Sequence, residues 1–360
     1  MLGKRPLALP NKKIHVGQMI ETIAHSHIGH AAYQDLLRLH KEGAVAEIVG
    51  NVQRKERGGR LYLYDTYRVG TKVVSRYIGE ATAETEARIA RAVEIKAQEK
   101  DRRAAQTRLT RILRAEGYQT LDAQTGSLLT ALSRIGVFRL GGTLVGTIAF
   151  RLYEGELGMR PGIDLMAQTG DIDIASFERL SLALGDQVTD GVGETLGTLA
   201  FRPVPSLDHG RVWKWRDASG ETLVEFLTPA FGEEGIRDLP ALGVSAQALH
   251  YLNFLIAEPI KAVALYRAGV LVQIPQPERF AIHKLIVSDR RRDGPDSLKA
   301  RKDRAQATFL IQALAEERPD ELAEAWEDAR GRGPRWRARI DSALARLPAV
   351  RARLDGLGLS

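Results

Sequence analysis

The 360-residue chain contains no cysteine, so disulfides, thiolate zinc sites and cysteine nucleophiles are excluded. It has no apolar run of membrane-spanning length, and its first residues lack the hydrophobic stretch of a secretion signal. We therefore expect a soluble, cytoplasmic protein without a membrane partner. The Gly-x4-Gly-Lys-Ser/Thr, Gly-x-Ser-x-Gly and His-Glu-x-x-His signatures are also missing. P-loop ATPases, serine hydrolases of that type and zincins are thereby excluded.

The basic residues are distributed unevenly. The formal net charge is +7, but residues 1–120 hold 22 Lys and Arg against 13 Asp and Glu, whereas the rest of the chain holds 30 against 32. A basic N-terminal third favours RNA or DNA as a partner, although a solvated basic surface would have the same composition. The length allows two or three domains, each with its own core.

The motif Asp171-Ile172-Asp173-Ile174 is the main chemical signal in the sequence. Strict alternation of acidic and apolar residues predicts a half-buried strand, in which Asp171 and Asp173 project to one side. Two adjacent carboxylates repel each other unless a cation lies between them. Mg²⁺ suits this arrangement, because it takes one or two carboxylates and completes its shell with water and substrate phosphates.

A glycine pair precedes this strand. The apolar run 135–140 ends at Gly141 and Gly142, and a helical pattern follows from Thr143. The first amides of a helix are unpaired and attract anions, and glycine allows a phosphate to approach the backbone closely. The sequence thus predicts a phosphate cradle at these three residues; a plain tight turn is the alternative.

A third carboxylate is predicted on a later hairpin formed by residues 211–217 and 221–229. Glu225 lies between apolar Val224 and Phe226, where a charge is unfavourable unless something pairs with it. Transfer chemistry with two metals uses such an acid to activate the attacking hydroxyl. Glu221 is the alternative, although its place beside the turn predicts a solvated side chain.

The N-terminal third predicts a helix over 16–41, strands over 44–54 and 61–79, and a long charged helix over 81–116 with Thr82 as its N-cap. The tyrosines of the hairpin could stack on bases or pack within the sheet. The histidines in 16–41 indicate a surface helix rather than a zinc site. Nucleic acid binding is predicted for the basic side chains around the turn and hairpin: Arg57, Arg60, Arg68, Lys72 and Arg76.

After residue 240 the pattern is largely helical. We expect a helix over 245–255, a β pair over 260–265 and 270–274, helices beginning near Pro277 and Ser297, and two amphipathic helices over 322–357.

Taken together, a strand, Gly-Gly-Thr, a helix and Asp-x-Asp on the next strand resemble the nucleotidyltransferase superfamily of the DNA polymerase β fold. More narrowly, GGTLVGT followed by TGDIDIA resembles a bacterial family within it, over roughly residues 122–314. The resemblance implies that Asp171 and Asp173 hold two Mg²⁺ ions, or Mn²⁺ in their place, and that Glu225 completes the site. Here 28 residues separate Gly142 from Asp171, more than the superfamily usually has. The surplus, 158–170, is interpreted as a substrate-facing loop.

A second likeness concerns the helices that begin near Pro277 and Ser297. Their His-Lys-Leu and Lys-Asp segments, separated by an Arg-rich loop, are similar to abortive-infection-type nucleotidyltransferase toxins. By this likeness Lys284 and Asp303 belong to the nucleotide site. The alternative is an ion pair between helices on a solvated face. Residues 290–292 could contact phosphates or form a solvated loop.

These features predict an α+β protein with a polymerase-β-like core of mixed sheet and helices. The expected domains are a basic N-terminal module (1–80), a connecting helix (81–118), the catalytic core (119–235) and a helical C-terminal domain (236–360). The expected function is metal-dependent transfer of NMP from an NTP to an acceptor hydroxyl, with RNA or DNA as a possible acceptor. The alternative is a non-catalytic nucleic-acid-binding protein with the same fold.

Overall fold

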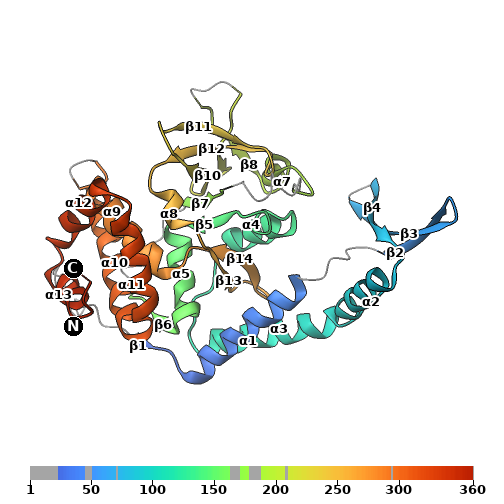
Figure 1. Ribbon diagram of the computed structural model, residues 1–360, viewed down its shortest axis with the longest axis horizontal. Helices are drawn as coiled ribbons and strands as arrows, with labels where there is room; N and C mark the ends of the chain where they lie inside the picture. The colour runs from blue at the N-terminus through green and yellow to red at the C-terminus, as the bar shows by residue number, and fades with distance from the viewer. Residues whose placement is uncertain are drawn as a thin grey trace, which may run out of the picture.

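The structure is a computed structural model that describes residues 23–44, 51–69, 72–162, 171–177, 188–206, 210–292 and 295–359. Figure 1 shows a body of one central sheet with helices around it, from which a helical arm leads to a small separate sheet. The α+β class expected from the sequence is confirmed. Among the described residues, no helix is both long and apolar enough to cross a membrane.

The central sheet is mixed and has the strand order β11-β12-β10-β7-β5. Strand β7 pairs in parallel with β10, which pairs in parallel with β12, whereas β5 is antiparallel to β7. The N-terminal half of β10 also pairs with β9, and β9 pairs with β8. The bounds are β5 (Thr143–Val145), β7 (Asp171–Ala175), β8 (Phe201–Pro203), β9 (Lys214–Asp217), β10 (Leu223–Pro229), β11 (Gly235–Leu239) and β12 (Val244–Leu249).

Alternation along β7 and β10 decides which face is buried. Ile172 and Ile174 of β7, and Val224 and Phe226 of β10, are all at most 1% exposed and belong to one apolar core. The residues between them face the other side of the sheet, where Asp171, Asp173 and Glu225 are only half-buried. The pattern that forms the core therefore also presents the acids together.

Helices and a hairpin pack around this sheet. The body contains helices α4 (Ala123–Arg134), α5 (Gly146–Leu157), α7 (Val192–Thr198) and α8 (Leu252–Leu255). The expected β pair is confirmed as β13 (Ile260–Ala264) and β14 (Val270–Ile274), which are antiparallel. The short strands β1 (Ile23–Ala24) and β6 (Met159–Arg160) form a separate pair.

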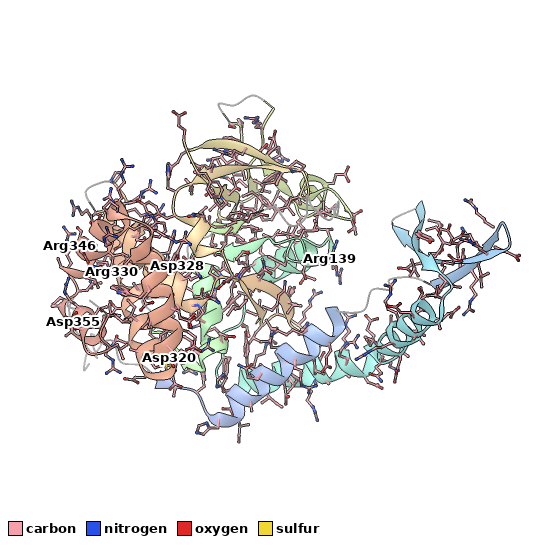
Figure 2. The ribbon with its side chains drawn as sticks, in the orientation of Figure 1. Arg139, Asp320, Asp328, Arg330, Arg346 and Asp355 are labelled. Atoms are coloured by element: carbon pink, nitrogen blue, oxygen red, sulfur yellow. The ribbon has the colours of Figure 1, made fainter. Side chains whose placement is uncertain are left out.

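The C-terminal part is a bundle in which α9 (Pro277–Arg290) and α10 (Ser297–Glu317) pack side by side (Figure 1). It continues with α11 (Pro319–Gly331), α12 (Pro334–Leu344) and α13 (Pro348–Asp355). Proline begins four of these helices, where its missing N–H leaves no intrahelical bond unmade. Asp328, labelled in Figure 2, accepts hydrogen bonds from Arg279 of α9 and Arg332, which links two helices.

The arm consists of α1 (His27–Ala44) packed against α3 (Glu99–Ala115), with α2 (Ala83–Ala97) leading to the small sheet. That sheet has the order β2-β3-β4, with bounds β2 (Asn51–Arg57), β3 (Arg60–Val69) and β4 (Lys72–Glu80). The N-cap prediction is confirmed, because the Thr82 hydroxyl accepts from the Thr85 amide at 3.2 Å. The single helix expected over 81–116 is in fact two helices, separated at Gln98.

Three other sequence expectations differ from the structure. Residues 245–249, expected to be helical, lie in strand β12, because pairing with both β10 and β11 outweighs local preference. Residues 137–140, expected as the strand before Gly-Gly-Thr, form turns. The C-terminal segment has three helices after α10 rather than two, since Pro348 begins a further helix beyond the expected division at 331–334.

The contact between the arm and the body predicts the effect of one substitution. A Cβ on Gly155 of α5 would clash with the ring of Tyr33 of α1, whose hydroxyl accepts from the Val263 amide. Gly155→Ala should therefore lower the free energy of unfolding by about 1–3 kcal/mol, although alanine is the better helix former. Urea denaturation tests this. Gly197→Ala in α7, where a Cβ meets nothing within 4 Å, is the control and should not destabilise.

Candidate active site

Three carboxylates lie together at the N-terminal ends of β7 and β10. In the register of these parallel strands, Glu225 is opposite Asp173 and Leu223 is opposite Asp171. Paired residues of neighbouring strands project to the same face of a sheet. The structure thus places Glu225 on the same face as both aspartates, whereas Glu221 is exposed before β10 begins.

The charges of these carboxylates destabilise one another. Burial, and then the neighbouring Glu225 and Asp171, raise the pKa of Asp173 to about 7, although Lys284 and Arg291 act in the opposite direction. Burial and Asp171 also raise the pKa of Glu225, against Lys214 and Lys299. At neutral pH this corner of the sheet therefore carries closely spaced negative charge, which a cation would stabilise.

The donor set fits a hard divalent cation that arrives with its substrate. Among the described residues, no group of three or more His, Cys, Asp or Glu side chains is arranged as a cage that could hold a metal ion. Mg²⁺ needs no such cage, because it is commonly bound by one or two carboxylates together with substrate phosphates and water. Asp171 and Asp173, two residues apart on one strand face, are suited to that role.

The helix N-terminus nearest the acids begins at Gly146, not at the predicted glycine pair. Gly141 and Gly142 lie in a turn, and a Cβ on Gly142 would meet the Val137 carbonyl oxygen at 2.7 Å. Thr143 is fully buried in β5, where its hydroxyl donates to the Gly141 carbonyl and accepts from the Gln273 amide. The prediction that these three residues open the helix is wrong, because the chain first forms β5 against β7.

Gly146 takes the place expected of the predicted pair. Its φ is +68°, and a Cβ there would lie 2.5 Å from Oδ2 of Asp173. Only glycine allows the first turn of α5 to pass so close to this carboxylate. The positive φ and the close approach to Asp173 therefore both require glycine at position 146.

Helix α10 adds a lysine to the same point. Nζ of Lys302 donates to the Thr147 hydroxyl at 2.8 Å, at the start of α5. Burial and the Lys284 charge lower the pKa of Lys302, while Asp303 and Asp171 act against them. A helix N-terminus and an ammonium group therefore lie beside Asp173, an arrangement that attracts anions.

Lys284 and Asp303 contact each other, as the ion-pair alternative anticipated, but in the protein interior rather than on a solvated face. Nζ of Lys284 donates to Oδ1 of Asp303 at 2.5 Å, and Arg291 donates to Oδ2 at 2.7 Å. Lys284 and Asp303 are 8% and 2% exposed. Their direct binding of nucleotide stays a prediction, and the charges of Lys284 and Arg291 lower the pKa of Asp173.

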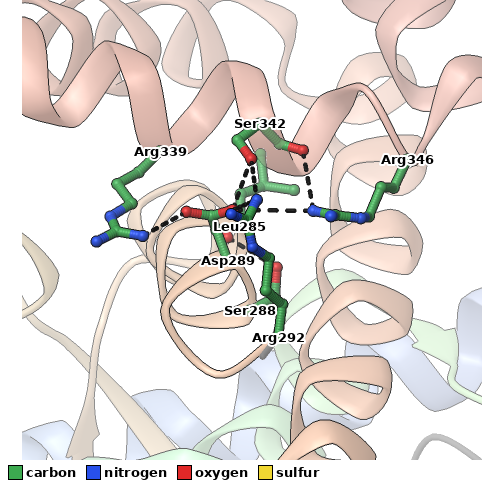
Figure 3. A network of polar contacts seen from close by, with 7 residues as sticks. All are labelled: Leu285, Ser288, Asp289, Arg292, Arg339, Ser342 and Arg346. Carbon is green, nitrogen blue, oxygen red and sulfur yellow. Dashed lines mark hydrogen bonds and ion pairs between the residues drawn. The ribbon is translucent and has the colours of Figure 1, made fainter. Parts of the chain in front are cut away.

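A second buried network fixes the end of α9 (Figure 3). Asp289 accepts from Arg339 at 2.7 Å, from Ser342 at 2.7 Å and from Arg292 at 3.1 Å. Although burial opposes ionisation, the hydrogen bonds from Arg339 and Ser342 hold the pKa of Asp289 below its usual value. The network joins α9 to α12 and so determines where α9 presents Arg291.

The predicted nucleic-acid residues lie on the small sheet at the end of the arm. Arg57 and Arg60 flank the β2–β3 turn and are exposed. Arg68, Lys72 and Arg76 belong to β3 and β4, but their side chains lie outside the described part. Most of the predicted loop, residues 163–170, also lies outside it. Nucleic acid binding by this sheet stays a prediction.

Sequence reasoning missed Gly146, Thr147 and Lys302. A signal for the first two was present, because GGTLVGT contains a second Gly-Thr after the apolar pair Leu144-Val145. Interpreting that pair as a short strand would have moved the helix start to Gly146. Lys302 belongs to the Lys-Asp segment of the second likeness, but its contact with Thr147 depends on how α10 packs against the body.

Comparison with known proteins identifies a family and one similar structure. A family model described as "Nucleotidyltransferase" matches residues 123–331, more than half of the chain. A nucleotidyltransferase-like protein from Paracoccidioides brasiliensis, described as antigenic, matches in structure with 15% identity and a TM-score of 0.31, over 64% of this chain and 96% of that one. Among curated proteins, none matches.

The raised pKa of Asp173 predicts a pH-dependent gain from removing its charge. In the metal-free protein, the folded state holds this proton up to about pH 7, whereas an unfolded aspartate loses it near pH 4, so ionisation costs stability as the pH rises between these values. Asp173→Asn should therefore raise the free energy of unfolding at pH 8 by on the order of 4 kcal/mol, with little effect at pH 4.

Urea denaturation in EDTA at both pH values measures this difference. Asp217→Asn serves as the contrast, because hydrogen bonds from Ser219 and the Thr222 amide lower the pKa of Asp217 and its loss should destabilise at neutral pH. An equal change in the free energy of unfolding at pH 4 and pH 8 would show that ionisation of Asp173 does not destabilise the folded protein.

Proposed function

The chain belongs to the nucleotidyltransferase family, and from this premise we propose that it transfers NMP from an NTP to an acceptor hydroxyl and releases pyrophosphate, with Mg²⁺ as its metal. One observation supports this most strongly: Asp171, Asp173 and Glu225 share one sheet face, beside the N-terminus of α5. Metal-binding acids and an anion-binding helix end are the two components that phosphoryl chemistry needs.

The side of the site that would bind the NTP, called here the donor side, lies toward β5 and α5. The first amides of α5 have no intrahelical partners and carry the positive end of the helix dipole. Gly146 leaves the backbone accessible, and Lys302 adds an ammonium group at Thr147. We place the β- and γ-phosphates of the NTP here, in place of the cradle predicted at residues 141–143.

Asp171 and Asp173 would hold the metal, which when bound neutralises phosphate charge and polarises the bond to the leaving group. This binding would also remove the carboxylate repulsion described above. The buried ion pairs of Asp303 with Lys284 and Arg291 keep α9 and α10 in place, and their excess positive charge acts on Asp173.

Glu225 is suited to accept the proton of the attacking hydroxyl. The pKa of Glu225 is raised toward neutral pH, which makes its carboxylate a better general base than that of an ordinary glutamate. In the transfer, the acceptor oxygen forms a bond to the α-phosphorus, the bond to pyrophosphate breaks with its electron pair, and the hydroxyl proton moves to Glu225. Positioning and electrostatic stabilisation lower the barrier, without a covalent enzyme intermediate.

Two glycine variants test where the donor phosphates bind. Gly146→Ala places a methyl group against Asp173 and strains a positive φ, so affinity for a non-hydrolysable NTP should fall at least about tenfold. Gly141→Ala also strains a positive φ, but its Cβ meets nothing within 4 Å. It should cost about 1–2 kcal/mol of stability and leave NTP affinity unchanged. Calorimetric titration in Mg²⁺ distinguishes these cases. A larger loss of NTP affinity in Gly141→Ala than in Gly146→Ala would show that the phosphates bind at Gly141 instead.

The activity itself is tested with the four labelled NTPs, Mg²⁺ and total cell extract, by following which molecules acquire label. Asp173→Asn keeps the shape of the side chain but removes the charge, so transfer should fall at least about a hundredfold while the fold is retained. Wild-type protein that binds no NTP in Mg²⁺ would contradict the proposal and favour a non-catalytic nucleic-acid-binding protein.

A further inference from the structure

The acid-bearing face of the sheet continues into a row of basic side chains. In the antiparallel pairing of β9 with β10, Lys214 is opposite Glu225 and Arg216 is opposite Leu223. In the next pairing, of β8 with β9, Arg202 is opposite Arg216. Because residues directly opposite each other share a face, Lys214, Arg216 and Arg202 lie on the same face as the three acids. These three residues are named here the basic strip.

The outer part of the basic strip is open to solvent. Arg202 and Arg216 are exposed, whereas their neighbours Phe201 and Trp215 point into the core and are each 4% exposed. Neither arginine has a hydrogen bond or ion pair with another described residue. Lys214 differs, since its charge acts on Glu225 and its Nζ lies 4.6 Å from the ring centroid of Trp213. Two guanidinium groups are therefore available to an external anion.

The position of the basic strip relative to the donor side indicates its ligand. The helix N-terminus and Lys302 lie on the β5 side of the acids, and the strip lies on the opposite, β9 side. In-line displacement requires the attacking oxygen and the leaving pyrophosphate to lie on opposite sides of the α-phosphorus. With the triphosphate on the β5 side, the acceptor must approach over β9 and β8.

The spacing of the basic strip favours a polyanion with several phosphates. Neighbouring strands are roughly 4.8 Å apart, so the row from β8 to β7 spans three strand spacings, roughly 14 Å. A small acceptor with a single charge could not contact Arg202 while presenting a hydroxyl at the acids. A polynucleotide can do both, because its backbone carries a phosphate at each nucleotide and its end carries the hydroxyl.

We propose that the basic strip binds the phosphodiester backbone of a polynucleotide acceptor and directs its terminal hydroxyl to Asp171, Asp173 and Glu225. This inference rests on the proposed nucleotidyl transfer, and it places acceptor binding on the catalytic sheet rather than only on the arm. Arg202 and Arg216 bind phosphates without reading bases, so the strip contributes affinity and orientation but little sequence preference.

The test uses the full chain with 5′-labelled 12-nucleotide RNA and DNA single strands. Fluorescence anisotropy is followed between 50 and 200 mM salt, with Mg²⁺ and a non-hydrolysable NTP present. In Arg202→Ala/Arg216→Ala the slope of log K against log salt should flatten by about 1.4, for two lost phosphate contacts on a single strand. The affinity at 100 mM salt should fall about tenfold.

The matched control removes the same charge elsewhere. Arg335 of α12 and Arg351 of α13 are exposed and have no ion pair with a described residue, so Arg335→Ala/Arg351→Ala should bind both strands as the wild type does. Circular dichroism melting confirms that both double variants fold. In extension assays the strip variant should raise the KM for the oligonucleotide about tenfold, with kcat nearly unchanged.

The outcomes separate this inference from the proposed function. Wild-type protein that binds NTP and labels cell extract, but binds neither oligonucleotide, would overturn the strip as an acceptor site and leave the transferase intact. Equal oligonucleotide binding by the strip variant and the control would do the same. Wild-type protein that binds no NTP in calorimetry would instead overturn the proposed function, and with it the acceptor role. A preference for RNA or DNA identifies the class of polynucleotide.

Discussion

Repulsion among the carboxylates of β7 and β10 is the constraint on which the site depends. Asp171, Asp173 and Glu225 share one face because the alternating partners Ile172, Ile174, Val224 and Phe226 fill the core on the other. The same pattern that stabilises the sheet thus concentrates negative charge on its other face. The fold tolerates this because lysines and arginines from β9, α9 and α10 surround the acids, and because protonation or a cation can neutralise them.

The surrounding helices are arranged around that charge. Helix α5 begins at Gly146. Glycine is the only residue type that allows the first turn of this helix to pass so close to Asp173. Helices α9 and α10 are joined by the buried contacts of Asp303 and anchored to α12 through Asp289. Their packing brings Lys302 to the start of α5. Positive groups therefore lie on both sides of the acids, with the helix end toward β5 and the basic strip toward β8.

The sequence predicted the parts of this arrangement that depend on local pattern. Alternation was enough to pair Asp171 with Asp173 on a strand, and apolar neighbours were enough to single out Glu225, whose register with Asp173 the structure shows. The helix start could not be placed in the same way, because Leu144 and Val145 suit a helix as well as a three-residue strand, and only pairing with β7 decides between them. Strand β12 and Lys302 likewise depend on tertiary contacts that no local pattern encodes.

We expect a divalent cation and a nucleotide to bind together between the aspartates of β7 and the N-terminus of α5. Electron paramagnetic resonance of Mn²⁺, titrated with the protein in the presence and absence of a non-hydrolysable NTP, measures this directly. We expect tight Mn²⁺ binding that requires the nucleotide and is lost in Asp171→Asn. Mn²⁺ binding that is the same with and without nucleotide, or that survives in Asp171→Asn, would contradict the account.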